Sequence, residues 1–471
     1  SNNTAVGHAS LGANTTGANN VAVGANALDA NTTGYANVAV GVEALSTQIA
    51  AGYNNTAVGY QALKLNLSGT ENSAFGRVAL GANTTGTNNT ASGNYALLLN
   101  TTGANNVAVG SFALDANTTA ANNTAVGTSA LGANTTGALN VAVGSISLDA
   151  NTTGTYGVAI GHSALGSNTT ADGNTAVGYN TLGANTTGTS NVGLGMSALS
   201  ANTTGQRLVA VGTDSLDANT TGQRSTAVGY AALSTNTEGN YNTAIGDIAL
   251  QNNTTGDSNT AVGLGALEAN TTASNNTAVG VEALDANTTG ADNTAVGRSS
   301  LGVNITGINN TAVGHTALGG VLNDGNTAIG YSAGGGITSG QYNTAIGLVA
   351  ATAAVYTGDH NSSIGYNANP SAADSAGQFT LGDTNISNLR CNDQSISALS
   401  DQRDKTDVIA SPYGLDFINT IQPRQFKWET REGNAKDGKT RVGFIAQELL
   451  TACDGNNAVL DLVLDDNPEK L

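Results

Sequence analysis

The ten residues ALSDQRDKTD, at positions 398–407, contain two residue types from which a nucleophilic site can be built. The hydroxyl of Ser400 becomes a good nucleophile only if a base takes its proton, and the amine of Lys405 can be that base only if burial or nearby cations lower its pKa. Five residues apart, the two side chains would lie about 140° apart on a helix, so a turn must separate them. The competing interpretation is that Ser400 caps a helix whose charges face solvent, and the hexapeptide SDQRDK alone favours it.

These charged residues follow a long array of repeats. A glycine that ends the phrase AVG, or a variant of it, recurs 22 times from Gly7 to Gly365. Of the 21 intervals between these glycines, 18 are 17 residues long. A unit this short cannot hold a pair of helices or a propeller blade. It predicts a mainly β fold, a parallel β-solenoid or β-roll of 17-residue coils with two short strands in each coil.

The residue types keep their phase within each repeat. Aliphatic residues precede the glycine, as at Val6 and Val23, and leucines follow it by four residues, as at Leu11 and Leu28. We expect these two columns to form the narrow core. Because side chains alternate along a strand, the alanines of AVG, such as Ala22, should lie on the opposite face, where another backbone comes close and chains associate.

Asparagines form two further columns. One precedes the AVG glycine by four residues and the other opens the phrase NTTG. Stacked one strand spacing apart, their amides can hydrogen-bond between coils, so we expect two asparagine ladders. The glycines of NTTG, such as Gly17, Gly34 and Gly86, should supply positive φ angles where the chain reverses.

Three binding functions of the array are disfavoured. NTT matches an N-glycosylation acceptor, but a ladder already explains a phase-locked asparagine. Rows of threonine could bind ice, yet Thr15 and Thr16 are adjacent and cannot both point to one face. A calcium-binding roll needs aspartate at a fixed phase, whereas Asp29 and Asp115 share their phase with glycines such as Gly132.

Composition excludes several classes of function. Residues 1–399 carry 6 Lys/Arg against 20 Asp/Glu, and residues 400–471 carry 9 against 13, for a net charge of −18. So few cations cannot replace phosphate counterions, which excludes nucleic acid and an acidic membrane surface as partners. Cys391 and Cys453 are too few for a disulfide framework or a zinc site, and no apolar run approaches the length of a membrane span. Neither a cofactor nor a metal is expected. The chain begins at Ser1 in mid-phrase, so we expect a missing N-terminal part that attaches it to other proteins.

The repeat of the AVG phrase ends after Gly365. We predict a shaft of 22 coils over 1–368 and a junction over 369–399, with a loop at Pro370 and short strands around QFTLG and SNLRC, that closes the open end of the solenoid. Residues 400–471 have the composition of a small α+β domain. Expected there are an amphipathic helix at GLDFINTI, an extended segment at RQFKWE, a helix at GFIAQELL and a strand at AVLDLVL.

Three blocks of this last domain, SDQRDK, GLDFINTIQPRQFKW and RVGFIAQEL, resemble in their order the C-terminal intramolecular chaperone of phage endosialidase-type tailspikes and fibres. The resemblance implies a self-cleaving domain in which Leu399–Ser400 is the scissile bond, Ser400 the nucleophile and Lys405 its base. That domain usually runs longer, so we expect its final part to be absent. The N.AVG..A phrase resembles the shorter head repeats of trimeric autotransporter adhesins, which implies a homotrimer.

Together these features favour a structural protein, a homotrimeric phage tail fibre in the virion. Its partners would be its own copies, other tail proteins, and a host-surface receptor of glycan or outer-membrane type. The alternative is a bacterial surface adhesin or extracellular filament with the same chaperone. Autoproteolysis is the only activity expected, because a glycosidase needs paired carboxylates flanked by aromatic residues and the array offers neither.

Overall fold

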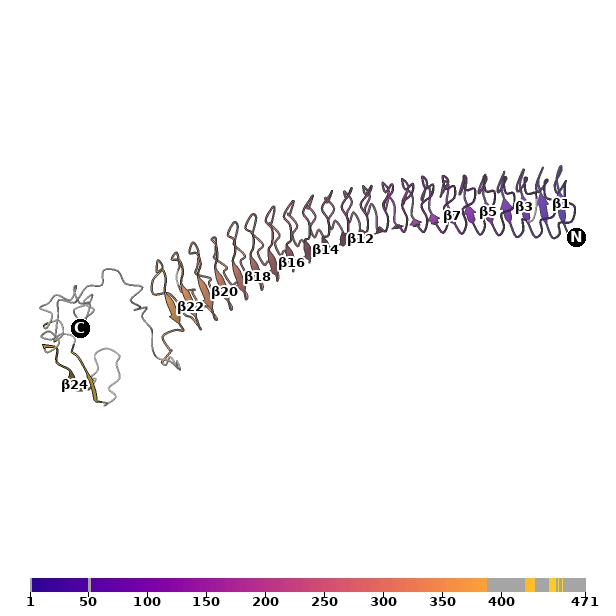
Figure 1. Cartoon of the computed structure of the whole chain (residues 1–471). Helices are drawn as coiled ribbons and strands as arrows, with labels where there is room; N and C mark the ends of the chain where they lie inside the picture. The colour runs from indigo at the N-terminus through magenta and orange to yellow at the C-terminus, as the bar shows by residue number, and fades with distance from the viewer. Residues whose placement is uncertain are drawn as a thin grey trace, which may run out of the picture. The chain divides into compact units, whose positions relative to one another are not determined.

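The computed structural model describes residues 2–49, 52–353, 355–387, 420–427, 440–445, 448 and 451. Contacts divide the chain into two compact units, Ser1–Asn388 and Leu389–Leu471. The first unit is a parallel β-solenoid in which each coil contributes one three-residue strand (Figure 1). The predicted fold class is therefore confirmed, although the coil has one strand and a series of turns rather than two strands.

The strands of the first unit recur at the spacing of the sequence repeat. They are β1 (Thr4–Val6), β2 (Val21–Val23), β3 (Val38–Val40), β4 (Thr56–Val58), β5 (Ser73–Phe75), β6 (Thr90–Ser92), β7 (Val107–Val109), β8 (Thr124–Val126), β9 (Val141–Val143), β10 (Val158–Ile160), β11 (Thr175–Val177), β12 (Val192–Leu194), β13 (Val209–Val211), β14 (Thr226–Val228), β15 (Thr243–Ile245), β16 (Thr260–Val262), β17 (Thr277–Val279), β18 (Thr294–Val296), β19 (Thr311–Val313), β20 (Thr327–Ile329), β21 (Thr344–Ile346), β22 (Ser362–Ile364) and β23 (Phe379–Leu381).

Each strand pairs in parallel with the strand of the next coil, as where Val158 lies beside Thr175 and Ile160 beside Val177. Equivalent residues of successive coils are thus neighbours along the whole sheet. Strand β23 continues this order, with Ser362 beside Phe379. The sheet therefore extends into the predicted junction. The signal was present in the sequence, because Gly382 follows Gly365 at the regular interval of the repeat.

The glycine at the end of each strand is required by its conformation and by its neighbour. Gly161 has a φ of +134°, and a Cβ added to it would lie 2.3 Å from the carbonyl oxygen of Gly178 in the next coil. The same holds at Gly178, whose added Cβ would lie 2.4 Å from the oxygen of Gly195. Only glycine allows both this backbone geometry and this approach between coils.

The core differs from the sequence prediction. Alanines at the centre of the strands, such as Ala22 and Ala39, are fully buried with the leucines Leu28 and Leu45, whereas the residue before the glycine is half-buried or exposed. The prediction that the aliphatic column before the glycine forms the core was wrong. So was the prediction that chains associate through the alanines, because the alanines already lie inside the single chain.

A natural substitution shows why alanine faces inward. In β12 the central residue is Gly193 instead of alanine, and the preceding coil has Thr181 where most coils have alanine. A Cβ on Gly193 would lie 2.6 Å from Cγ2 of Thr181. A strand and the turn of the preceding coil are so close that a larger residue on one side requires a smaller one on the other.

Both predicted asparagine ladders are confirmed. In the first, the backbone N–H of Asn191 donates to Oδ1 of Asn174 (2.9 Å); in the second, Nδ2 of Asn202 donates to Oδ1 of Asn185 (2.8 Å). The ladders meet at one acceptor, because Nδ2 of Asn191 and Nδ2 of Asn202 both donate to the carbonyl oxygen of Gly205, at 2.9 and 3.2 Å. These buried amides thus hold each coil closed and join it to the next.

The glycines of NTTG have a different role from the one predicted. Gly17, Gly34 and Gly86 do not have positive φ angles. A Cβ on Gly86 would instead lie 2.4 Å from Oδ1 of Asn83, so the small residue makes room for the ladder. Ala120 occupies the same phase and still accepts from Nδ2 of Asn117 at 3.1 Å, so some coils adjust to one more carbon atom. Positive φ angles occur instead at non-glycine residues, such as Asn26 at φ 57° and Leu28 at φ 52° in the turn after β2.

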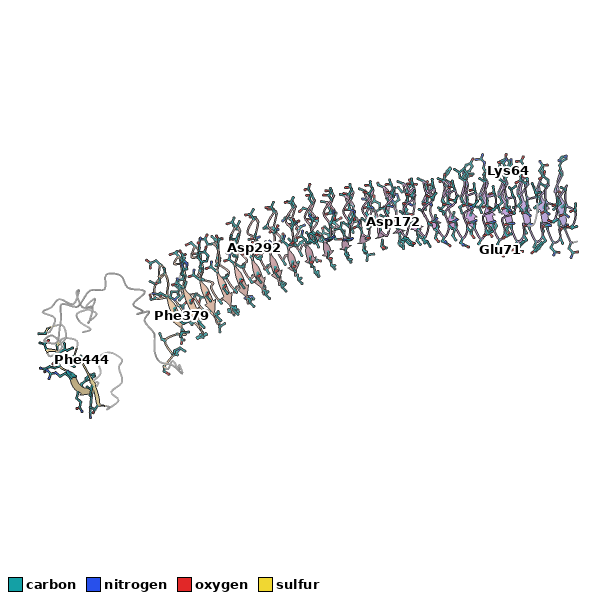
Figure 2. The ribbon with its side chains drawn as sticks, viewed as in Figure 1. Lys64, Glu71, Asp172, Asp292, Phe379 and Phe444 are labelled. Atoms are coloured by element: carbon teal, nitrogen blue, oxygen red, sulfur yellow. The ribbon has the colours of Figure 1, made fainter. Side chains whose placement is uncertain are left out.

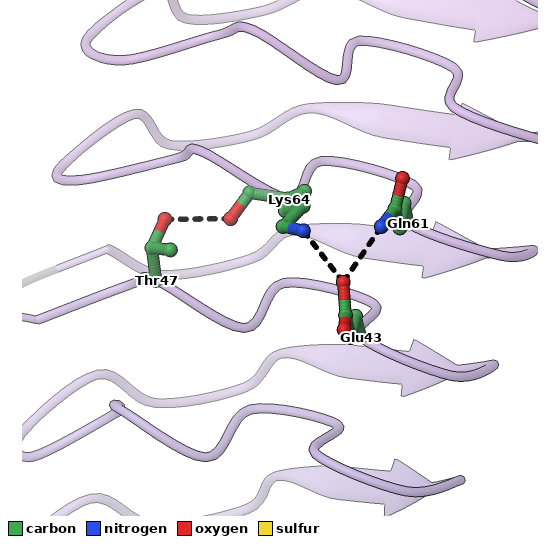
Figure 3. A network of polar contacts seen from close by, with 4 residues as sticks. All are labelled: Glu43, Thr47, Gln61 and Lys64. Carbon is green, nitrogen blue, oxygen red and sulfur yellow. Dashed lines mark hydrogen bonds and ion pairs between the residues drawn. The ribbon is translucent and has the colours of Figure 1, made fainter.

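The coil between Gly41 and Gly59 has one extra residue and its own polar contacts. Gln48 occupies the ladder position, donating to Oδ1 of Asn31 (3.1 Å). Figure 3 shows Oε2 of Glu43 accepting from Nζ of Lys64 (2.6 Å) and from Nε2 of Gln61 (2.7 Å). The hydrogen bond from Lys64 is the main reason that the pKa of the Glu43 carboxyl is lowered. A partly exposed pair of this kind contributes little to stability, so its main effect is to align neighbouring coils.

The second unit is described at a few residues only. Strands β24 (Arg424–Lys427) and β25 (Thr440–Gly443) pair antiparallel, with Lys427 beside Thr440. The extended segment predicted at RQFKWE is thus confirmed over 424–427. The helix predicted from Gly443 begins later, because Gly443 ends β25 and is followed by two non-helical residues, while Glu448 is helical. Thr420, in GLDFINTI, is helical too. Most of that segment, SNLRC beyond residue 387, and AVLDLVL lie outside the described residues.

Replacing the glycine at a strand end should destabilise the solenoid. We expect Gly161→Ala to cost at least about 1–3 kcal/mol, because alanine is strained at this φ and its Cβ meets the backbone of the next coil. The measurement is the urea midpoint of unfolding followed by circular dichroism. Gly166→Ala in the same coil is the control, since its Cβ would lie 3.3 Å or more from any neighbour and other coils carry side chains at that phase. Equal effects of the two substitutions would contradict the role of the strand-end glycine.

Candidate functional site

The predicted cleavage site lies outside the described residues. This applies to Leu399 and Ser400, which flank the predicted scissile bond, and to Lys405, the predicted base. Their assignment therefore stays a prediction from sequence. What the structure describes of the same unit is the hairpin of β24 and β25 and a few helical residues.

Besides the pairing of β24 with β25, an ion pair and a ring contact join the described residues of this unit. Nε of Arg424, at the start of β24, donates to Oε2 of Glu448 at 2.7 Å, which raises the pKa of the arginine. The ring of Phe426 lies over Gly443, since a Cβ on this glycine would be 3.3 Å from Cε1 of the ring. Both contacts join the segment RQFK to the segment RVGFIAQEL. Two of the three sequence blocks are therefore neighbours in the fold.

This arrangement agrees with a comparison against known families. Residues 400–460 match the family described as chaperone of endosialidase. The match covers all three blocks on which the resemblance was based, and it begins at Ser400. No curated protein matches the chain. The resemblance of the C-terminal segment to the chaperone of endosialidase-type fibres is therefore confirmed. The solenoid of 17-residue coils is consistent with a fibre of this type.

The match bears on partners as well. A chaperone of endosialidase segment suggests that copies of this chain associate into trimers.

The ion pair of Arg424 and Glu448 was not anticipated from the sequence. Its only signal there was a pair of opposite charges in two separate blocks, which does not identify a contact.

The surface of the shaft presents dispersed charges. Figure 2 shows Lys64, Glu71, Asp172 and Asp292 at separate points along the array. Across the described parts of the chain, no three His, Cys, Asp or Glu side chains gather as metal ligands would. Helices long and apolar enough to cross a membrane are likewise absent from those parts.

Aromatic side chains on the shaft stack on each other between coils. The rings of Tyr35 and Tyr53 lie 5.1 Å apart and nearly parallel, and those of His162 and Tyr179 lie 5.6 Å apart. The guanidinium of Arg77 lies 4.9 Å from the ring centre of Tyr95. Such contacts between adjacent coils stabilise the stack.

A column of aspartates occupies the turn five residues after the strand-end glycine. Burial is the main cause that raises the pKa of Asp115, Asp149, Asp217 and Asp285. Asp217 is the clearest case, because its Oδ1 is buried without a hydrogen-bond partner. An ionised carboxylate in this position opposes folding.

The pKa shift of Asp217 predicts a pH-dependent stability. A raised pKa means that the folded chain binds the proton more tightly than the unfolded chain, in which the pKa of aspartate is about 3.9. The resulting stability is fully present below that pH and is lost as pH rises through the folded pKa. We therefore expect Asp217→Asn to melt at a higher temperature than the parent at pH 7, with the difference vanishing below about pH 3.9.

Melting temperatures measured by circular dichroism at pH 3 and pH 7 test this. The control is Asp292→Asn, which removes the same charge from an exposed turn position. A stabilisation by Asp217→Asn that is the same at both pH values, or one matched by the control, would contradict the burial of this carboxylate as its cause.

Proposed function

We propose that this chain is a structural fibre protein of a phage tail that attaches the virion to a host surface, and that its C-terminal segment drives trimerisation and then cleaves itself off. One observation carries the proposal: a solenoid of nearly identical, in-register coils is followed in the same chain by a segment that matches a chaperone of endosialidase. The first creates an assembly problem and the second can solve it.

The assembly problem follows from the regularity of the coils. Strands β1–β22 have the same length and nearly the same residues, so two chains shifted by one coil still match at 21 of 22 strands. Such a shift costs only the contacts of one coil, and register is weakly specified wherever the pattern repeats. A terminal segment that joins the chains before the shafts associate sets the register once for the whole fibre.

The proposed cleavage uses the residues at the start of the matched segment. Lys405 takes the proton of the Ser400 hydroxyl, and Oγ attacks the carbonyl carbon of Leu399. The peptide bond then breaks, the amino group of Ser400 is released, and Leu399 is held as an ester until water hydrolyses it. The products are a shaft that ends at Leu399 and a chaperone that begins at Ser400. After cleavage the shaft no longer carries the chaperone that assembled it, so assembly becomes irreversible.

Location in the virion and a host receptor of glycan or outer-membrane type belong to this proposal. They are supported by the long, charge-poor shaft and by the kind of protein in which such chaperones were recognised. A regular solenoid of 22 or more coils at about 4.8 Å each extends on the order of 100 Å, which is suited to reaching a surface.

The cleavage is tested on a denaturing gel and by mass spectrometry of the fragments. Expression of the chain should yield a fragment that ends at Leu399 and a second, shorter fragment that runs from Ser400 to Leu471. We expect Ser400→Ala and Lys405→Met to leave one full-length band, because each removes one half of the pair. An unchanged cut between residues 399 and 400 in either variant would overturn the assigned roles.

Two matched controls separate chemistry from folding. Ser397→Ala removes a hydroxyl three residues upstream, and Arg403→Met removes a cation two residues before Lys405; both should be cleaved like the parent. Size-exclusion chromatography with light scattering on Ser400→Ala gives an independent readout of assembly. A trimeric, uncut Ser400→Ala chain would support chaperone and cleavage as separate steps.

A further inference from the structure

One face of the long parallel sheet is left uncovered. The central residue of each strand points into the coil, so the first and third residues of strands β1–β22 point out of it; we call these residues the outer stripe. The first residue is Thr, Val or Ser in all 22 strands, and the third is apolar in 21 of them, the exception being Ser92. Ile160, Ile245 and Ile329 are 41%, 42% and 43% exposed.

The outer stripe excludes charge along its whole length. Residues 1–399 contain 26 charged side chains, 6 basic and 20 acidic, and none of them lies in strands β1–β23. A sheet face that meets water ordinarily carries polar and charged residues, whereas parallel sheets are covered on both faces. The residue types of the outer stripe are therefore those of a covered face.

Its size is also that of an interface. Twenty-two strands at about 4.8 Å give a length on the order of 100 Å, and two outward residues per strand give a width of about 10 Å. The resulting area, on the order of 1,000 Å², exceeds the roughly 800 Å² that each partner contributes to a stable protein interface. The apolar third-residue column makes up about half of this area, and a continuous exposed apolar strip of that size often marks a functional surface.

We propose that the outer stripe is the surface through which copies of this chain associate, side by side, parallel and with equivalent coils at the same level. This inference rests on the proposed function, which requires self-association, and adds the surface that performs it. A covering partner must present a complementary surface that repeats at the same spacing over the same length. Another copy of this chain has that repeat.

The distribution of charge on the shaft also favours a second copy of this chain as the partner that covers the outer stripe. Each copy carries a net charge of −18, so two copies repel wherever their acidic residues approach. The outer stripe is a long surface from which these residues are missing, and association through it keeps the carboxylates of the turns apart. Parallel copies in register also place each strand opposite the equivalent strand of the other copy, so that uncharged residues meet at every level.

The border of the outer stripe has the composition of an interface rim. The residue after the strand-end glycine is a large exposed side chain in many coils, as at Tyr60, Tyr179, Met196, Tyr230, Leu264 and Tyr331. The same column holds Arg77, Asp247 and Arg298. Tyrosine, methionine and arginine are enriched where protein surfaces meet, with charged groups kept to the edge.

Cysteine cross-linking tests the surface in the full chain. With Cys391 and Cys453 replaced by serine, Val177→Cys in β11 should form covalent dimers on mild oxidation, because residue 177 of each copy then lies at the same level within the interface. Thr204→Cys, at an exposed position in the turn between β12 and β13, should stay monomeric on a denaturing gel. Co-expression of tagged Val143→Cys with untagged Val228→Cys should give no mixed dimer, since these residues lie five coils apart.

Introducing charged residues into the outer stripe tests how much it contributes to the stability of the oligomer. Val177→Lys combined with Val228→Lys places like charges of each copy against each other in the interface. We expect the concentration at which the oligomer dissociates to rise at least tenfold, measured by light scattering, while Thr204→Lys leaves it unchanged. Because residues 177 and 228 point out of their own coil, circular dichroism should show the solenoid intact in both variants.

The outcomes separate the two proposals. An oligomeric parent with cross-links at residue 177 only, and with dissociation by the paired lysines only, supports the outer stripe. An oligomeric parent that forms no cross-link at residue 177 and tolerates both lysines overturns the outer stripe and leaves the fibre intact. A parent that is monomeric at all concentrations overturns the self-associating fibre itself.

Discussion

Parallel in-register pairing between residues one coil apart is the constraint on which the rest of this structure depends. It stacks Gly161 on Gly178 so closely that neither can carry a side chain, and it brings Asn185 and Asn202 within hydrogen-bond distance inside the core. At such positions the residue type is constrained by the equivalent residues in the coils before and after it. A change in one coil is therefore felt by three, which explains how the sequence keeps its phase over 22 repeats.

The insertions show how much this pairing tolerates. The coil after Gly41 has one residue more than its neighbours, yet Val38 still pairs with Thr56 and Val40 with Val58. The extra length lies in the turn, where the longer side chain of Gln48 reaches the ladder that asparagine serves elsewhere. The change in coil length is thus taken up in the turn, because a one-residue shift inside a strand would move Ala39 out of the core and Val40 into it.

The period of the repeat predicted the solenoid, its coils and both asparagine ladders, since these depend only on spacing. It did not predict which strand face is inside. Alternation separates Ala22 from Val23 but is symmetrical between them, and preferring the larger aliphatic residue for the core was reasonable for an ordinary sheet. The face that lies inside depends on the short distance between a strand and the turn of the preceding coil, which the paired sizes of Gly193 and Thr181 reveal. The cleavage site, in contrast, rests on three sequence blocks, because the period of the shaft does not extend to Ser400.

Burying alanine has a consequence for assembly. A coil filled by alanine, leucine and asparagine gains little from apolar burial per residue, because alanine removes little surface from water. Its valines and isoleucines, which would gain more, lie on the outside, where only a second molecule can cover them. In the proposed assembly, part of the hydrophobic stabilisation of a shaft is gained only when a second shaft covers these residues, and a misregistered pair would gain nearly all of it. This makes the order of events critical: the register must be set before the shafts meet, and a segment at one end of the chain is placed to set it.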